Sequence, residues 1–505
     1  MNQNLNELRA FLATLDKAPE PMHVSSELHA LSSASDADID IVLDRALYPF
    51  QRAGVAYALR QRRCIIGDEM GLGKTIQGIA VVAQAHKEGM KSLVVVPPSL
   101  RLNWQREFKA TAPWLSVAIV TGNTVTEVPK EADVIIIGDS NVDQWATALC
   151  NARFGCLIVD EAHRAKNAKA NRTKGIVSIA KSVNDKGYVV LLSGTIVVNR
   201  PAELVSPLTI IGRLDRVFGG RHSFLQRYCD PIHNGWGWTY NGASNTTELN
   251  ANMRGTCYVR RKKMDVLTEL PAKRRAQVSV EVPEEALIKY RHAEEDFRDF
   301  VITNGGAQAW DKASKAEVIT RINALRHLLG NAKVANVVEH VENLLAEDEQ
   351  VIVFAYHTDV INAICKALAS HNVVKVGGGM TDDAKQSAVD SFQSGEARVF
   401  VGQFQAAGVG LTLTASSNVV MAEIPWTPAD AVQAEDRSHR IGNTVGTMAW
   451  WLTVADEDRP TIDDRMWALL NAKHTTVSAV LDGYGVDLGA EGGILADLID
   501  GIIGN

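Results

Sequence analysis

The stretch that decides the fold reads Gly67-Asp68-Glu69-Met70-Gly71-Leu72-Gly73-Lys74-Thr75. A bound triphosphate needs a glycine-rich turn whose N–H groups approach its oxygens, a lysine between the β- and γ-phosphates, and a hydroxyl for Mg²⁺. These parts are supplied by Gly71, Gly73, Lys74 and Thr75. The run 63–66, apolar towards its end, predicts a strand before the turn, and 76–85 reads as a helix whose N-terminus favours anions. The stretch therefore predicts an ATP-phosphate loop between a strand and a helix.

A pair of acids follows a second predicted strand. The apolar run 156–159 ends at Asp160-Glu161-Ala162-His163, which places both carboxylates at the carboxyl edge of a sheet, where doubly wound folds bind ligands. We expect Asp160 to hold Mg²⁺ through water, and Glu161 to orient or deprotonate the attacking water. Phosphoryl transfer asks a protein mainly for such positioning and for charge neutralisation. The two motifs together predict an ATP hydrolase.

Two arginines in the second half of the chain complete the predicted site. They belong to the run Gln433-Ala434-Glu435-Asp436-Arg437-Ser438-His439-Arg440-Ile441-Gly442. Arg437 and Arg440 lie three positions apart, so they share one face of a helix. Such a pair can reach a γ-phosphate across a cleft and stabilise its transition-state charge, the arginine-finger role. An isolated pair of this kind is usually a surface ion pair, so the interpretation depends on the two motifs above.

Strand-like runs alternate with helical stretches in both halves of the chain, as in parallel sheets covered on both faces. The runs are 92–96, 134–137, 157–159 and 189–192, then 351–354, 373–376, 399–401 and 419–422. Between the halves, 284–329 is charged and helix-forming. We predict an α/β fold of two RecA-like, doubly wound parallel-sheet lobes with an ATP cleft between them and helical insertions.

The same pattern predicts five segments. They are an N-terminal extension (1–40), a first lobe with the ATP-binding motifs (41–270), a helical linker or protrusion (271–330), a second lobe of the helicase C-terminal kind (331–480) and a tail (481–505). A length of 505 residues exceeds what one core usually accommodates, which agrees with two lobes.

Composition excludes several classes of protein. The six cysteines include no C-x-x-C pair, so neither a zinc site nor a disulfide framework is indicated. No charged leader precedes an apolar stretch, and no run of about 18 uncharged apolar residues occurs. We expect a cytoplasmic protein with no membrane partner, located at the nucleoid or in host-cell cytoplasm if its source is bacterial or viral.

A net charge of −7 argues against a surface that is basic all over, but it leaves room for a local basic groove. Lys and Arg cluster at 260–263 and 273–275. Clusters of this kind can bind phosphates in an otherwise acidic protein, although an ordinary solvated face accounts for them equally well. Arg260, Arg261 and Lys263 are therefore the candidate DNA contacts.

With these motifs in place, the chain resembles the Swi/Snf-type branch of the superfamily-two helicase-like DNA translocases, from Leu47 to about Lys473. The resemblance is carried by 47–51, 68–75, the DEAH box 160–163 with Lys166-Asn167, 192–195 and 408–411. It implies an adenine contact at Gln51, an ATP contact at Gly410 and a DNA contact at Trp426. It further implies that hydrolysis is coupled to nucleic-acid contact by Ser193, Gly194, Thr195 and Gln433.

A narrower similarity is to the annealing-helicase subgroup, which rewinds DNA strands. It is carried by Arg227-Tyr228-Cys229-Asp230, Trp236-Gly237-Trp238 with Ser244-Asn245, and 259–261 through Leu270-Pro271-Ala272-Lys273. The aromatic residues Trp236, Trp238 and Tyr240 can stack on bases at a junction, or form the core of a small subdomain. The chain departs from the family pattern at Ile196, Asn443, Glu423 and Lys385, where proline, glutamine, aspartate and arginine are usual.

The resemblance implies a DNA-dependent ATPase that binds ATP with Mg²⁺, acts as a monomer on duplex or forked DNA, and serves replication or repair, its protein partners there being unknown. Each cycle of lobe closure and reopening would move it along one strand. Two alternatives stay open. A strand-separating DNA or RNA helicase shares all the ATPase motifs, and a nucleotide-gated DNA clamp would bind without productive hydrolysis. The presence of Glu161 and both arginines speaks against the clamp.

Overall fold

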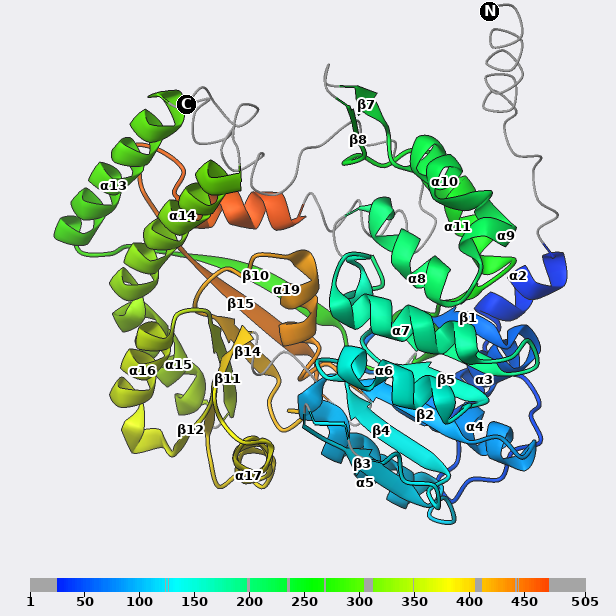
Figure 1. The fold of residues 1–505 in the computed structure, drawn as a ribbon. Coiled ribbons are helices and arrows are strands. Elements are labelled where there is room, and N and C mark those ends of the chain that lie inside the picture. The colour runs from blue at the N-terminus through cyan, green and yellow to red at the C-terminus, as the bar shows by residue number, and fades with distance from the viewer. Residues whose placement is uncertain are drawn as a thin grey trace, which may run out of the picture.

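The computed structural model describes residues 25–122, 124–125, 127–197, 200–233, 237–267, 269–303, 312–347, 349–404, 411–440, 443 and 445–471, leaving aside the side chains of 312–315. Figure 1 shows two α/β lobes side by side, the first blue to green and the second largely yellow to orange. Each lobe is built on its own parallel sheet. The predicted two-lobe α/β architecture is confirmed.

The sheet of the first lobe has seven parallel strands. In spatial order they are β3 (Val117–Val120), β4 (Val134–Gly138), β2 (Ser92–Val96), β5 (Cys156–Val159), β6 (Tyr188–Leu192), β1 (Arg63–Ile66) and β9 (Tyr258–Val259). Successive residues of β2 enter opposite cores, since Leu93 joins one apolar cluster and Val94 the other. One face is covered by α3 (Pro49–Gln61), α4 (Lys74–Lys87) and α5 (Arg101–Thr111), the other by α6 (Val142–Asn151), α7 (Asn171–Ser182) and α8 (Val205–Ile210).

The second sheet has six parallel strands. Their order is β10 (Lys273–Val280), β15 (Thr447–Val454), β14 (Asn418–Met421), β11 (Val351–Ala355), β13 (Val399–Gln403) and β12 (Val373–Val376). Its faces are covered by α15 (Val334–Ala346) and α16 (Thr358–Ala367) on one side and by α17 (Asp382–Gln393) and α19 (Pro428–Glu435) on the other. Continuous apolar runs such as 351–355 are typical of parallel strands that are buried on both faces.

The structure moves the start of the second lobe. β10 pairs in parallel with β15 along its whole length, from Lys273 opposite Thr447 to Val280 opposite Val454. The lobe therefore begins at residue 273, inside the segment 271–330 that the sequence assigned to a helical linker. The strand escapes prediction because it lies at a sheet edge, alternates between exposed and half-buried residues, and opens with three basic side chains.

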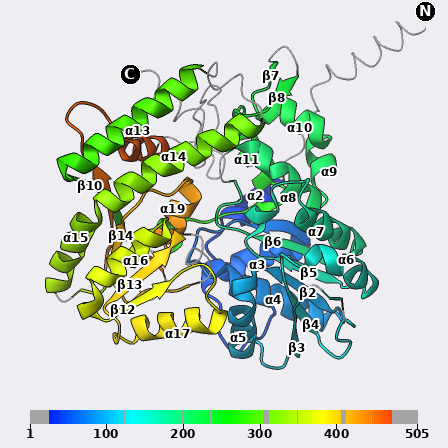
Figure 2. The same cartoon turned by 60° about the vertical axis from the view of Figure 1, so that its left-hand side comes forward.

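The helical prediction for 284–329 is confirmed by α13 (Glu284–Thr303) and α14 (Lys312–Ala332). Their inner faces share an apolar cluster with the second sheet, in which Tyr290 and Ile322 belong with Phe354. Figure 2 shows α14 extending from the second lobe towards the first. The segment is thus a protrusion of the second lobe.

The first lobe carries an insertion after β6. It contains η3 (Pro201–Leu204), α8, α9 (Leu214–Phe218), α10 (Gly220–Tyr228), the antiparallel hairpin β7 (Ile232–His233) and β8 (Trp238–Thr239), and α11 (Thr246–Arg254). Trp238 is 53% exposed, whereas Tyr240 packs partly against the core. Trp236 lies outside the described residues. Base stacking by Trp238 stays a prediction, and its exposure is compatible with it.

Short elements complete the described chain. They are α2 (Ser26–Ser33), η1 (Pro98–Leu100), η2 (Ala162–Ala165), α12 (Lys263–Val266) and η4 (Ala369–His371). Ser25 caps α2 by accepting a bond from Leu28 N (3.2 Å), and α2 packs against α3 and α11. Among the described residues, no helix combines the length and apolar character needed to cross a membrane.

Candidate active site

The loop between β1 and α4 has the backbone that its glycines allow. Gly71 and Gly73 have φ angles of +85° and +73°, which glycine adopts without steric cost. Gly73 caps the N-terminus of α4, where N–H groups without helical partners favour a phosphate. Gln51 lies buried beside the loop, donating to Leu72 O (3.0 Å) and accepting from Tyr48 N (3.0 Å). The predicted phosphate loop is formed, and Gln51 is fixed against it.

A cavity of about 290 Å³ opens at this loop and is lined by both lobes. The predicted residues that line it are Gln51, Gly71, Gly73, Lys74, Thr75, Asp160 and Glu161 from the first lobe and Arg437 and Arg440 from the second. Gly410 lies outside the described residues. The structure therefore brings three motifs that are distant in sequence to one cavity.

Lys74 lies within this cavity against the carbonyl groups of its own loop. Its ammonium group donates to Asp68 O (2.9 Å) and Glu69 O (3.3 Å). Burial lowers the pKa of Lys74, although nearby carboxylates, Glu161 first, oppose the shift. A charged phosphate would bind such a partly desolvated ammonium group strongly.

The acidic pair lies at the carboxyl end of β5, as predicted. Asp160 accepts from Trp104 Nε1 (2.8 Å) and from Glu161 N (2.9 Å). Burial and the neighbouring charge of Glu161 raise the pKa of Asp160. Burial also disfavours ionised Glu161, but His163, Lys74 and Arg437 outweigh it and lower the pKa of Glu161. Glu161 is therefore the carboxylate that stays charged most readily.

Glu161 also has a strained backbone. Its φ angle is +47°, in the left-handed region that non-glycine residues rarely adopt. Such conformations cost about 1–3 kcal/mol and are kept where the surrounding structure fixes them, often at active sites. The contact of Glu161 with His163 Nδ1 (3.3 Å) is one of the interactions that fix this side chain.

The two arginines approach the loop from the second lobe. Arg437 is 1% exposed and donates to Leu411 O (3.0 Å). Arg440 donates to Asp436 O (2.9 Å) and to Thr412 Oγ1 (3.0 Å). Burial, followed by the charge of Arg440, lowers the pKa of Arg437 to about 9. A Cβ atom added at Gly71 would lie 3.0 Å from Arg440 Cγ, which shows how closely the lobes meet.

A buried network of ion pairs connects the arginine segment to the crossing between the lobes, the part of the chain that leads from β9 of the first sheet to β10 of the second. Lys263 Nζ lies 3.0 Å from Asp436 Oδ1 and donates to His439 O (2.6 Å). Lys273 donates to the same carboxylate of Asp436 (2.8 Å), and Arg275 donates to Glu435 (2.6 Å). Lys263 is 2% exposed. This placement corrects the expectation that Lys263 contacts DNA, because its charge is neutralised inside the protein.

Arg261 also differs from expectation, whereas the DNA contact of Arg260 stays a prediction. Arg261 is 3% exposed and donates to Asp68 Oδ1 (2.9 Å), so its assignment as a DNA contact is corrected in the same way. Arg260 is half-buried, and its guanidinium donates to the carbonyl groups of Gly67 (2.8 Å) and Gly194 (3.0 Å). Both arginines therefore support the backbone of the phosphate loop.

The segment predicted to couple hydrolysis to DNA lies directly behind the acids. Ser193 is buried, and its Oγ lies 3.3 Å from His163 Nδ1. Thr195 N donates to the same Oγ (3.3 Å). A Cβ atom at Gly194 would lie 2.6 Å from Met70 Cγ and 3.2 Å from Met70 N, so the close approach to the phosphate loop requires glycine. Glu161, His163 and Ser193 thus form one contiguous set of contacts.

Two further predicted residues lie in the second lobe outside the cavity. Gln433 is buried in α19. Trp426 is half-buried, with the Arg326 guanidinium 4.8 Å from its ring centre. Arg326 also lies 4.6 Å from the ring of Tyr356, so it is held between two aromatic rings. The DNA contact of Trp426 and the coupling role of Gln433 stay predictions.

Three residues that shape the site were not identified from the sequence. Trp104 in α5 holds the metal-site candidate Asp160 from 56 positions away, and no local pattern marks it. Asp68 belongs to the quoted loop, but its role as the partner of Arg261 spans 193 positions. Thr412, beside the quoted 408–411 stretch, lines the cavity and binds Arg440.

Comparison with known proteins gives two family matches. The pattern of the family described as "SNF2-related domain" matches residues 11–338, and that of "Helicase conserved C-terminal domain" matches residues 332–442. The first match alone spans more than half of the chain. The two matches together span residues 11–442, which include the first lobe and the second lobe up to the arginine segment.

Curated relatives share about a third of their aligned residues with this chain. A protein of Xenopus laevis named "SWI/SNF-related matrix-associated actin-dependent regulator of chromatin subfamily A-like protein 1" is 34% identical over 463 residues, covering 90% of this chain and 46% of its own. The human "DNA annealing helicase and endonuclease ZRANB3" is 31% identical over 490 residues, with 93% and 44% covered. The chain thus spans about half the length of these relatives. Among solved structures, a Sulfolobus solfataricus SWI2/SNF2 ATPase core in complex with dsDNA is 22% identical, with 88% and 96% covered and a TM-score of 0.43.

Proposed function

The chain belongs to the SNF2-related family, and from this premise we propose that it is a DNA-dependent ATPase that uses hydrolysis to move along duplex DNA. The observation that carries the proposal is the single cavity in which the phosphate loop, the acidic pair and the two arginines of the other lobe meet. A site divided between two lobes couples nucleotide turnover to lobe movement, since each nucleotide state favours a different separation.

The substrate in this proposal is ATP with its Mg²⁺. The loop and Lys74 hold the β- and γ-phosphates, and Gln51 contacts the base. Thr75 and Asp160 offer oxygens of the kind that Mg²⁺ prefers, and the buried acidic pair beside Lys74 suits a doubly charged cation. When bound with the nucleotide, the ion would neutralise phosphate charge.

Catalysis then requires few groups. Glu161 positions the attacking water, a role supported by the contacts that keep it charged. Arg437 and Arg440 stabilise the charge that develops on the transferred phosphoryl group, as a guanidinium supplied from a second lobe does in other phosphoryl-transfer enzymes. Closure of the lobes completes this constellation and excludes water.

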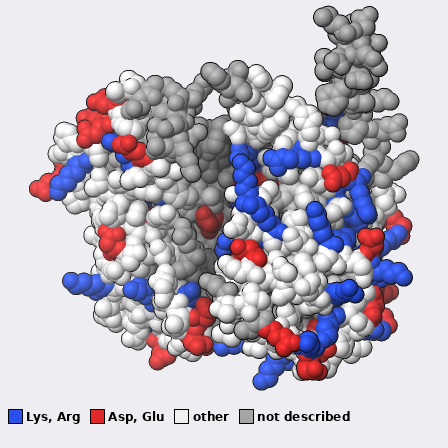
Figure 3. Space-filling view, viewed as in Figure 1, with Lys and Arg blue, Asp and Glu red and all other residues white. Residues whose placement is uncertain are grey.

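Coupling to DNA is proposed to run through Ser193, which touches His163 and through it Glu161. Duplex DNA would lie across both lobes and be held mainly through its phosphates, so binding should weaken with salt. Figure 3 shows that, on the face it presents, Lys and Arg gather mostly over the first lobe. This distribution supports a basic track, meaning a strip of positively charged surface that binds DNA phosphates, on a chain of net charge −7.

Annealing of separated strands is the specialisation that we propose for this translocase. The relative named DNA annealing helicase aligns with nearly all of this chain, and Trp238 presents an exposed ring at the tip of the first-lobe insertion. Aromatic stacking contributes about 1–3 kcal/mol per base. The competing function is strand separation, which uses the same ATPase motifs.

The test is ATP hydrolysis by the purified chain without nucleic acid and with single-stranded DNA, duplex DNA, forked DNA or RNA. Lys74→Ala serves as the control that loses turnover. Strong stimulation by duplex or forked DNA is the expected result, followed by strand rewinding in an annealing assay.

Stimulation by single strands or RNA alone would replace the proposal with a strand-separating helicase. Absence of hydrolysis under all these conditions, together with nucleotide-dependent DNA binding, would replace it with a clamp. A displacement assay on the forked substrate separates unwinding from rewinding.

A further inference from the structure

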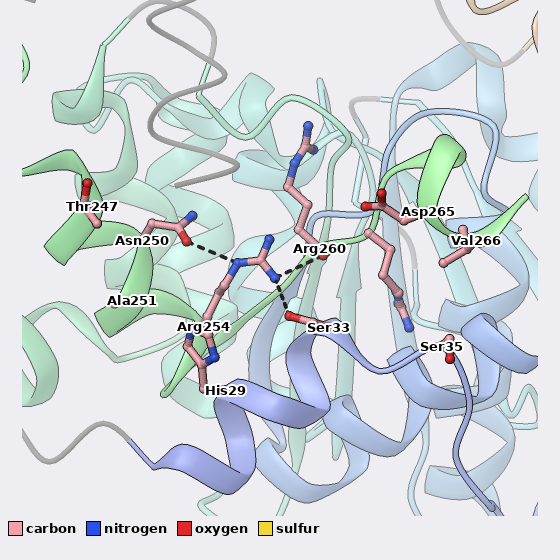
Figure 4. Close-up of a pocket in the computed structure, with 11 residues that line it drawn as sticks. His29, Ser33, Ser35, Thr247, Asn250, Ala251, Arg254, Arg260, Asp265 and Val266 are labelled. Atoms are coloured by element: carbon pink, nitrogen blue, oxygen red, sulfur yellow. Dashed lines mark hydrogen bonds between the residues drawn. The ribbon is translucent and has the colours of Figure 1, made fainter. Parts of the chain in front are cut away.

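A second cavity, of about 410 Å³, lies on the first lobe and shares no lining residue with the nucleotide cavity. Its walls come from three segments that are distant in sequence, α2, α11 and the residues that follow β9. Figure 4 shows Arg254 inside it, between Asn250 of α11 and Ser33 of α2. Its volume falls in the range of small-ligand sites.

Arg254 is fixed in this cavity entirely by neutral oxygens. Its Nε donates to Asn250 Oδ1 (3.2 Å), and its Nη1 donates to Ser33 Oγ (3.1 Å) and to Arg260 O (3.2 Å). Within the described part of the chain, no carboxylate lies within ion-pair distance of Arg254. Its neighbour in the same wall, Arg261, is by contrast neutralised by Asp68. Among the described residues, the positive charge of Arg254 is thus held in place without an ion pair.

The remaining walls add hydrogen-bonding groups. Ser33 and Thr247 carry hydroxyl groups, and the imidazole of His29 lies at the exposed rim. A guanidinium beside hydroxyl groups can recognise phosphate. Among the described residues no group accepts a hydrogen bond from Arg254 Nη2, so two N–H donors are left for a ligand, and the hydroxyls can add further bonds. Asp265 also lines the cavity, and its carboxylate opposes part of the attraction that Arg254 exerts on a phosphate.

We propose that this cavity binds a phosphate group, with Arg254 as its charged ligand. The cavity is larger than the ion alone needs, which leaves room for the group to which the phosphate is attached. That group is either the backbone of bound DNA or a small phosphorylated molecule. The inference goes beyond the proposed ATPase function and does not rest on it.

The test uses the full chain carrying Lys74→Ala, which weakens anion binding at the phosphate loop and removes any dependence on hydrolysis. Inorganic phosphate is titrated by calorimetry. In this background Arg254→Gln should weaken phosphate binding about tenfold or more, the value of one charge-assisted bond. The matched control is Arg216→Gln, an exposed arginine of α9 in the same lobe, which should leave phosphate binding unchanged.

Ser33→Asp is a second test variant, which keeps Arg254 and therefore distinguishes loss of phosphate binding from loss of folding. The new carboxylate would pair with Arg254, preserve the contact between α2 and α11, and repel phosphate. Its thermal unfolding should match that of the parent, while its phosphate affinity falls as in Arg254→Gln.

A second arm identifies the source of the phosphate. Affinity for a short duplex is measured over a salt series in the same variants. A loss of about 0.9 from the slope of log K against log salt in both pocket variants, but not in Arg216→Gln, would assign the pocket to one DNA phosphate. A loss of inorganic phosphate binding with an unchanged DNA slope would assign it to a small phosphorylated molecule. Unchanged binding in both arms overturns the proposal.

Discussion

The runs 260–263 and 437–440 each contain two arginines, yet the fold uses them differently. Arg261 and Lys263 are buried against the acids Asp68 and Asp436, and they stabilise the first lobe and its junction. Arg437 is just as buried, but with Arg440 it lines the nucleotide cavity. Burial alone therefore does not separate a cation paired within the fold from a cation that lines a ligand cavity. What separates them is whether the side chain faces an acid of the fold or a space that a ligand can enter.

The largest effect should come from Arg437→Ala. Because the guanidinium is expected to act on transition-state charge, kcat for DNA-stimulated hydrolysis should fall about 10³-fold or more. Nucleotide affinity, measured with a fluorescent ATP analogue, should change far less. Arg437→Lys should not rescue turnover, since an ammonium group lacks the planar fork. Near-normal turnover in the alanine variant would show that this run is structural as well.

Arg261→Ala should affect folding before it affects chemistry. Removal of the guanidinium leaves the buried Asp68 carboxylate without its ion-pair partner, which costs about 3–5 kcal/mol. Thermal and urea unfolding measure the loss, with exposed Arg216→Ala as a control expected to stay within about 0.5 kcal/mol. A variant of normal stability with weakened duplex binding would restore Arg261 as a DNA contact.

Asp436→Asn tests the junction itself. Burial would raise the pKa of Asp436, but Lys263 and Lys273 outweigh it and hold that pKa well below its usual range. A carboxyl with a lowered folded pKa stabilises fully above its unfolded pKa, about 3.9, and loses this contribution as the pH falls through the folded value. The substitution should cost about 3 kcal/mol at neutral pH, because it leaves the buried Lys263 without its carboxylate, while Lys273 keeps Glu435.

The same substitution should flatten the acid side of the stability profile. Melting temperatures between pH 3 and pH 7 measure this dependence. Asp299→Asn, at an exposed position of α13, is the control. Equal pH dependence in both variants would mean that the junction does not rely on the charge of Asp436.

The smallest effect is expected at Arg274, the exposed member of the run 273–275. Arg274→Gln should change stability by less than about 0.5 kcal/mol. If DNA passes this edge of the second sheet, the salt dependence of duplex binding should lose about 0.9 of its slope. An unchanged slope would restrict the basic track to other residues.

Much of the site was predictable because its chemistry is local. The loop 67–75 lies between a strand and a helix, and Asp160 directly follows a strand, so a short window of sequence contains the reason for each position. The apolar runs of the inner strands were predictable for the same reason. β10 was not, because its neighbour β15 is the last strand of the lobe in sequence and its own residues are mostly polar. The roles of Arg261 and Trp104 were not predictable either, because their hydrogen-bond partners lie 193 and 56 positions away in the sequence.

The shared carboxylate of Asp436 has a consequence for how this family member can be altered. Lys263 and Lys273 stand on either side of the crossing between the lobes, and both bind that one group. Both ends of the crossing are thereby held at one point, Asp436, which lies in the segment that carries the two arginines. The length of chain between Lys263 and Lys273 is constrained by these two contacts. Insertions or circular permutation within this crossing should be poorly tolerated, both in laboratory libraries and over evolutionary time, whereas surface loops whose ends are not held in this way can lengthen freely.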